Sequence, residues 1–130
     1  MQGDTQTSDG FRILLADDHG LMSQVVGAML EGYPTVSIVG EAANGMEAVS
    51  MAAALKPNLI IMDINMPRIN GIEATKQIKA AQPMISIIGL SVIDDKHVIQ
   101  AMKMAGAEAV LLKDELHQLY EAIRPGSLRQ

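Results

Sequence analysis

Five short apolar runs, separated by stretches with helical spacing, constrain the fold of this chain most strongly. The runs are rich in Ile, Leu and Val and span Phe11–Ala16, Val36–Glu41, Asn58–Met62, Ser86–Leu90 and Ala109–Leu112. Continuous apolar runs of this length are typical of strands that are buried on both faces of a sheet. Strands that alternate with helices are parallel and are joined by right-handed crossovers. The alternation therefore predicts an α/β domain with a five-stranded parallel sheet and helices on both faces.

Turn-forming pairs separate the runs and delimit the folded part of the chain. Asn44-Gly45, Lys56-Pro57, Asn70-Gly71, Gln82-Pro83 and Ala105-Gly106 all fall between apolar segments, where Gly and Pro interrupt regular structure. We expect the domain to occupy residues 11–124, with its last helix over residues 116–123. The polar residues 1–10 are interpreted as a linker or a segment left from cloning, and residues 125–130 as a polar tail.

The composition excludes several classes of protein. A chain of 130 residues, 48 % hydrophobic and 19 % charged, suits one globular domain and not a disordered segment. The absence of cysteine excludes disulfide frameworks, thiolate metal sites and cysteine nucleophiles. A net charge of −5 and an aromatic content of 2 % disfavour direct nucleic-acid binding. No apolar run approaches the ~20 residues of a membrane span and no signal peptide is recognisable, so we expect a cytoplasmic protein that does not contact a membrane.

Polar side chains follow four of the five apolar runs. They are Asp17 and Asp18 after the first run, Asp63 after the third, Ser91 after the fourth and Lys113 after the fifth. The carboxyl ends of parallel strands meet at one edge of a sheet, which is where such sheets bind ligands. Carboxylates gathered there repel one another, and Mg²⁺ is the hard cation that suits a site with few carboxylates and several waters. Lys113 offers a cation for a carboxylate or an incoming anion, and Ser91 offers a neutral donor.

A purely structural interpretation of these polar residues is the alternative. Asp17 and Asp18 would cap the following helix, since Asp is a favoured N-cap residue. Asp63 would be a turn residue before Met66-Pro67. Capping does not explain a lysine and a hydroxyl at two further strand ends, so the combination favours a site.

Four segments together resemble the receiver domain of two-component response regulators. They are Ile13–Asp18, Ile60–Pro67 with Gly71, Gly89–Ser91 and Leu111–Lys113, and the resemblance covers nearly all of residues 11–124. It implies a flavodoxin-like (βα)5 fold. It also implies a phosphoryl acceptor, with at most slow autophosphatase activity, that receives its phosphoryl group from a histidine kinase or a phosphotransfer domain.

The resemblance assigns roles to individual residues by their positions in the motifs. Asp63 is the implied phosphoacceptor. Asp18 would bind Mg²⁺ directly, Asp17 would act through water, and the backbone carbonyl of Asn65 would be a further protein ligand. In the loop after Asp63, Gly71 is expected to permit a positive φ, so that the loop folds tightly.

Two further side chains would act on the phosphoryl group. Lys113 would contact its oxygens, and Ser91 would hydrogen-bond to them once they are present. Transfer of the group to a carboxylate forms an acyl phosphate, and catalysis of that step is mainly positioning and stabilisation of charge.

The sequence departs from the family pattern at two positions. Most receivers carry an aromatic residue three positions before the lysine, whereas this chain has Val110. Because valine cannot swing a ring inward, we expect the response to be carried by the Ser91–Asp95 loop. Many receivers have proline after the lysine, whereas this chain has Asp114, which is interpreted as a cap of the last helix.

An interaction surface is expected over the fourth helix, the fifth strand and the fifth helix. Its apolar members would come from Ile99, Met102, Met104, Val110 and Leu112, not all of which can belong to the core. The methionines, Met102 and Met104 among them, are interpreted as mostly core filling, with an exposed subset available to a partner. The expected partner is an output domain in cis, in either a DNA-binding regulator or a hybrid histidine kinase. A second copy of the chain, forming a homodimer, is the alternative partner for this surface.

Other functions were compared with the receiver. A dehalogenase-type phosphatase needs Asp-x-Asp after the first strand, whereas Asp17 and Asp18 are adjacent. A flavodoxin needs a phosphate loop there, which these carboxylates would repel. A receiver that serves only for docking remains open because of Val110. A phosphohistidine at His19 is a minor alternative, and Asp94 and Asp95 are interpreted as opening the fourth helix.

Overall fold

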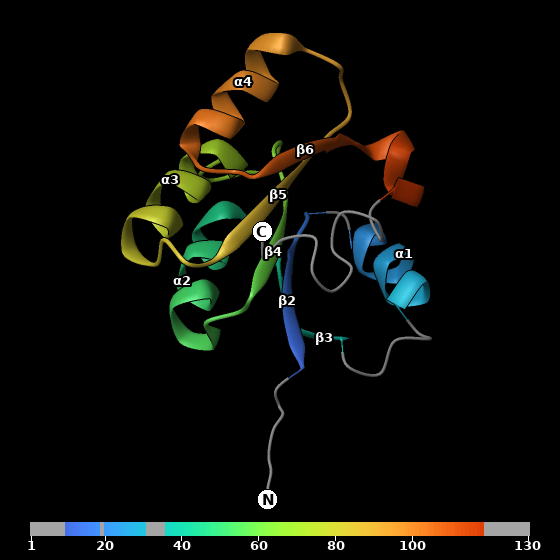
Figure 1. Ribbon diagram of the computed structural model, residues 1–130, viewed down its shortest axis with the longest axis vertical. Helices are drawn as coiled ribbons and strands as arrows, with labels where there is room; N and C mark the ends of the chain where they lie inside the picture. Colours follow the sequence, from blue (N-terminus) through green and yellow to red (C-terminus); the bar gives the residue numbers. More distant parts are fainter. Residues whose placement is uncertain (1–9, 19, 31–35, 119–130) are drawn as a thin grey trace, which may run out of the picture.

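The computed structural model describes residues 10–18, 20–30 and 36–118, and it confirms the predicted α/β architecture. The strands are β2 (Phe11–Ala16), β3 (Val36–Ala42), β4 (Leu59–Asp63), β5 (Ser86–Ser91) and β6 (Ala109–Leu112). The helices are α1 (Leu21–Leu30), α2 (Gly45–Leu55), α3 (Gly71–Ala81), α4 (Lys96–Ala105) and the 3-10 helix η2 (Lys113–Gln118). The strands form one parallel sheet in the order β3-β2-β4-β5-β6 (Figure 1).

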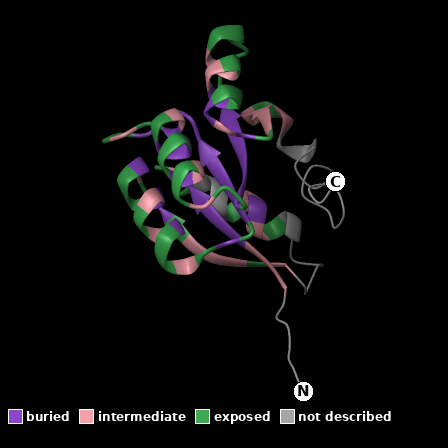
Figure 2. Cartoon of the chain, turned by 60° about the vertical axis from the view of Figure 1, so that its left-hand side comes forward, coloured by how far each residue is buried: buried purple, intermediate pink, exposed green. Residues whose placement is uncertain are grey.

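The two faces of the sheet build two separate apolar clusters. Every residue of β4 and β5 is buried, and these strands form the purple centre of Figure 2. Ile60 and Met62 of β4 belong to the cluster beneath α2, α3 and α4, whereas Leu59 and Ile61 belong to the cluster that contains Val26 of α1. This alternation is the period of two of a strand. Helices on both faces explain why the central runs are continuously apolar (Figure 1).

Strands β4 and β5 extend one residue further than the apolar runs predicted. Asp63 pairs in register with Leu90, and Ser91 pairs with Leu112. The Ile64 N–H donates to the Leu90 carbonyl at 3.0 Å, which continues the pairing past the end of β4. Asp63 and Ser91 are therefore the last residues of buried strands, and not the first residues of loops. Backbone pairing holds both of them more firmly than a loop would.

Three helices begin at polar caps. The side chains of Asn44, Asn70 and Asp95 accept hydrogen bonds from backbone N–H groups in the first turns of α2, α3 and α4. These bonds satisfy donors that have no partner within a helix. The expectation that Asp95 opens the fourth helix is confirmed, and Asp94 lies just before it.

The predicted last helix differs from the structure where it is described. Residues 113–118 form a 3-10 helix with a kink at Glu115, and residues 119–130 lie outside the described part of the chain. Asp114 lies just before the kink of η2 at Glu115, and its role as a cap of the last helix stays a prediction, because most of that helix lies outside the described residues. In the described ranges, no helix combines the length and the apolar character needed to cross a membrane.

Gly71 is required by close packing and not by a positive φ. Among the described residues, positive φ values occur at Gly20, Gly106, Lys56 and Arg68, so the expectation for Gly71 was wrong. A Cβ at position 71 would lie 2.8 Å from the Cα of Ile64 and would collide with the Asp63 carbonyl oxygen. The start of α3 is thus packed directly against the backbone that carries Asp63.

This packing predicts opposite effects of alanine at two helical glycines. Gly71→Ala should lower the free energy of unfolding by about 2 kcal/mol or more, because backbone atoms cannot move aside. Gly27→Ala in α1 should raise it by about 0.5–1 kcal/mol, since no atom lies within 4 Å of a Cβ there. Urea unfolding measures both values. A Gly71→Ala protein as stable as the parent would contradict the packing described.

Candidate phosphoryl-transfer site

Carboxylates from two neighbouring strands meet at the carboxyl edge of the sheet. Asp17 and Asp18 follow β2, and Asp63 ends β4, which pairs with β2. One ligand oxygen from each of the three side chains lies within 4.8 Å of the others. Asp63 is buried, Asp17 is half-buried and Asp18 is exposed. The predicted convergence of these three residues is confirmed, and the cluster opens to solvent on the side of Asp18.

Lys113, the first residue of η2 directly after β6, reaches the same cluster. Its Nζ lies 2.9 Å from Oδ2 of Asp63, and the Asp63 side chain is only 2 % exposed. The backbone N–H of Asn65 donates to Oδ1 of Asp63 at 3.1 Å. Both oxygens of the buried carboxylate therefore have a donor, and these two bonds fix its orientation. Asp63 and Lys113 are 50 positions apart in the chain, and the parallel sheet brings them together.

The ionised form of Asp63 is disfavoured despite this ion pair. Burial has the largest effect and raises the pKa of the carboxyl above the ordinary Asp value. The hydrogen bond and charge of Lys113 lower the pKa, as does the Asn65 N–H, whereas the Asp17 side chain raises it. Lys113 therefore does not fully offset the burial of this carboxylate. A set of hard oxygen donors with excess negative charge fits a divalent cation such as Mg²⁺.

Ser91 lies at the same edge, but its hydroxyl is bonded to its own loop. The side chain is 1 % exposed and ends β5, the strand next to β4. Its Oγ donates to the Ile93 carbonyl at 2.8 Å and accepts from the Ile93 N–H at 3.2 Å. Any bond from Ser91 to a group on Asp63 therefore requires this turn to change.

Of two further predicted residues, the structure describes Asn65 but not His19. Asn65 is exposed and follows β4, with its N–H directed to Asp63, while ligation through its carbonyl stays a prediction. His19 lies outside the described residues.

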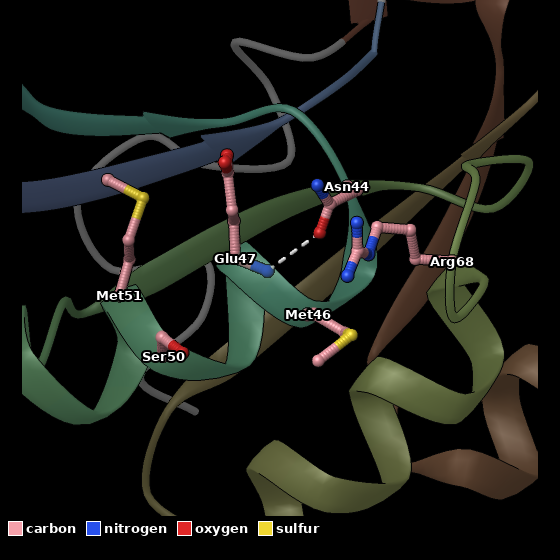
Figure 3. A pocket seen from close by; sticks show the side chains of 6 residues that line it. All are labelled: Asn44, Met46, Glu47, Ser50, Met51 and Arg68. Carbon is pink, nitrogen blue, oxygen red and sulfur yellow. Dashed lines mark hydrogen bonds between the residues drawn. The ribbon is translucent and has the colours of Figure 1, made fainter.

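A pocket at the start of α2 was not anticipated from the sequence. It is lined by residues of α2 and its cap together with Arg68 from the loop after β4 (Figure 3): Asn44, Met46, Glu47, Ser50, Met51 and Arg68. Glu47 accepts from the Ala43 N–H at 2.8 Å, and Asn44 accepts from the Glu47 N–H at 2.9 Å. These two polar groups form a capping box for α2, and the Asn-x-x-Glu spacing was the sequence signal for it.

Comparison with known proteins agrees with this geometry. The family model for the response regulator receiver domain matches residues 13–124. The transcriptional regulatory protein LiaR of Bacillus subtilis (strain 168) is 40 % identical over 119 residues, which cover 89 % of this chain and 56 % of LiaR. The chain therefore spans about half the length of this curated relative.

Two solved structures share the fold. The response regulator domain of Thermotoga maritima CheB is 32 % identical with a TM-score of 0.80, covering 88 % of this chain and 94 % of that one. The isolated REC domain of RcsB from Salmonella enterica serovar Typhimurium, determined with the phosphomimetic BeF3⁻, is 26 % identical with a TM-score of 0.79, covering 90 % of each chain. With the family match over residues 13–124, these similarities show that the chain belongs to the response regulator receiver domain family of two-component systems.

Proposed function

We propose that Asp63 accepts a phosphoryl group from a histidine kinase or a phosphotransfer domain. The observation that carries the proposal is the buried Asp63 carboxylate, oriented by Lys113 at 2.9 Å and set beside Asp17 and Asp18. A buried carboxylate with a perturbed pKa at the ligand-binding edge of a parallel sheet is a typical functional group.

The donors around Asp63 would hold Mg²⁺. Asp18, Asp63 and the backbone carbonyl of Asn65 would bind the ion, and Asp17 would act through water. The support is the approach of the three carboxylates within 4.8 Å and their incomplete compensation by Lys113. When bound, the ion supplies positive charge that stabilises the transferring phosphoryl oxygens.

In the proposed transfer, an Asp63 oxygen attacks the phosphorus of the donor phosphohistidine. The P–O bond forms as the P–N bond breaks, and the imidazole nitrogen keeps the electron pair. The product is an acyl phosphate on Asp63. Lys113 already lies beside the accepting carboxylate, so its ammonium can move to the new oxygens without a large rearrangement. Later attack by water returns Asp63 and inorganic phosphate, which is the slow autophosphatase reaction.

Ser91 would report the modification to the rest of the domain. The phosphoryl oxygens would draw its hydroxyl away from Ile93, which changes the loop between β5 and α4. Val92 and Ile93 are 63 % and 59 % exposed, so this change would move apolar surface at the mouth of the site.

The partners follow from the family and from the length of LiaR. A transcriptional regulator with about twice the matched length supports an output domain in cis, and a hybrid-kinase context or a homodimer is an alternative assembly. We place the receiver at residues 11–124, between a linker and a polar tail, in the cytoplasm. The output domain, and not this acidic receiver, would contact DNA.

A direct test is phosphorylation by a small donor. With Mg²⁺ and acetyl phosphate, intact-mass analysis should show one added phosphoryl group in the parent and none in Asp63→Asn. Lys113→Ala should be labelled at least about tenfold more slowly, because a charge beside the transferring group is lost. Equal labelling of Asp63→Asn and the parent would refute the assignment. Loss of labelling in His19→Ala alone would support a histidine acceptor, and a chain that is never labelled would support docking only.

The metal site predicts a thermal shift. Millimolar Mg²⁺ should raise the Tm of the parent by mass action, and Asp18→Ala should abolish the shift because an oxygen ligand is lost. Asp94→Ala is the matched control, since this exposed Asp lies outside the cluster, and it should keep the full shift. An unchanged parent Tm at physiological salt would contradict the site.

The raised pKa of Asp63 predicts a gain in stability on neutralisation. In metal-free buffer at pH 7, Asp63→Asn should have a higher Tm than the parent, because a desolvated charge is removed. The folded parent binds a proton more tightly than the unfolded chain, so the difference should shrink as the pH falls through the raised pKa towards the ordinary Asp value. A parent that is more stable than Asp63→Asn at pH 7 would count against this reasoning.

A further inference from the structure

Met102 anchors α4 to the sheet. All residues of α4 are described, and only Met102 and Ala105 are buried, Met102 completely. The interpretation of Met102 as core filling is therefore confirmed, and Met102 does not join the expected interaction surface. Met104, two positions further along the same helix, is 78 % exposed.

The Met102 side chain lies directly on the backbone of β5. A Cβ at Gly89 would be 2.9 Å from Cγ and 3.1 Å from Cε of Met102, so a larger residue at position 89 would displace the Met102 side chain. The same Cβ would be 3.5 Å from Cγ2 of Val110, the register partner of Gly89 on β6. Met102 and Val110 thus share the space over Gly89. An aromatic ring at position 110 that turned into this space would meet Met102.

The same side chain connects three elements next to the site. Gly89 is two residues before Ser91 on β5, so both positions face the same side of the sheet. On α3, the Thr75 hydroxyl donates to Sδ of Met102 at 3.7 Å in a fully buried contact. Four residues, 92–95, join Ser91 to the first turn of α4. The connection from Ser91 therefore enters α4 at its start, and Met102 packs the later part of the helix over Gly89.

We propose that Met102 couples the Ser91 loop to α4, in the place of the aromatic side chain that most receivers carry at position 110. Methionine is unbranched and has three rotatable bonds, so it can follow a movement of α4 over Gly89 without leaving a cavity. Val110 is stiff at χ1 and cannot do so. The proposal rests on phosphorylation of Asp63 and adds the route by which that event reaches the surface of α4.

The test compares two leucine variants of the same helix. Amide NMR spectra of the parent, Met102→Leu and Met104→Leu are recorded with and without beryllofluoride and Mg²⁺, and labelling by acetyl phosphate is measured in parallel. In the parent, shifts at Ser91–Lys96 should extend to the amides of Ala101 and Lys103. Met102→Leu should reduce these α4 shifts by about twofold or more, because a branched side chain adjusts less freely. Met104→Leu should match the parent, and all three proteins should be labelled equally.

The outcomes separate this inference from the proposed function. Labelled proteins in which Met102→Leu keeps the full α4 response, or in which the parent has none, would overturn the coupling and leave the phosphoacceptor in place. A parent that is neither labelled nor shifted would overturn both.

A packing measurement checks the underlying contact without phosphorylation. Gly89→Ala should lower the Tm of the parent, because its methyl group meets Met102. The same change should lower the Tm less in a Met102→Ala background, where the space is empty. Equal losses in the two backgrounds would overturn the inference, since Met102 would then not occupy the space over Gly89.

Discussion

The burial of one carboxylate, Asp63, is the constraint on which the rest of the site depends. Its strand is the middle one of five, and every residue of that strand is buried. Asp63 itself, the last residue of the strand, is paired with Leu90 of β5. Burial raises the pKa of Asp63, and the cation of Lys113 at 2.9 Å only partly offsets that cost. A dication would compensate the three carboxylates of the cluster, and in the proposed function the dication and Lys113 together would offset the charge of the phosphoryl oxygens.

Packing and backbone conformation restrict which residues can occupy positions near Asp63. Gly71 begins α3 directly against the backbone of Asp63 and Ile64, and Arg68 adopts a left-handed φ of 71° in the same loop. On β5, Gly89 leaves room for Met102. Both glycines are required by atoms that come from elsewhere in the fold. The helices α3 and α4 are therefore packed directly against β4 and β5, the strands that end at the site.

Much of the fold and of the site could be predicted from the sequence because the signals were local and repeated. The apolar runs marked five parallel strands, and polar residues at strand ends marked Asp17, Asp18, Asp63 and Lys113. Features that depend on tertiary contacts were missed. The later ends of β4 and β5 follow from pairing with neighbouring strands, and the close fit of Met102 over Gly89 joins residues 13 positions apart in sequence. The bonds of Ser91 to Ile93 could not be predicted either, because a serine after an apolar run has many local partners.

The titration of Asp63 itself tests the central claim most directly. The carboxyl-carbon NMR shift of this residue would be followed against pH in metal-free buffer and again with Mg²⁺. We expect a midpoint above that of an ordinary Asp without the metal, because burial outweighs Lys113, and a lower midpoint once the cation is present. A metal-free midpoint at or below the ordinary Asp value would show that Lys113 already compensates the carboxylate. That result would contradict a site in which the burial of the Asp63 carboxylate outweighs the compensation by Lys113.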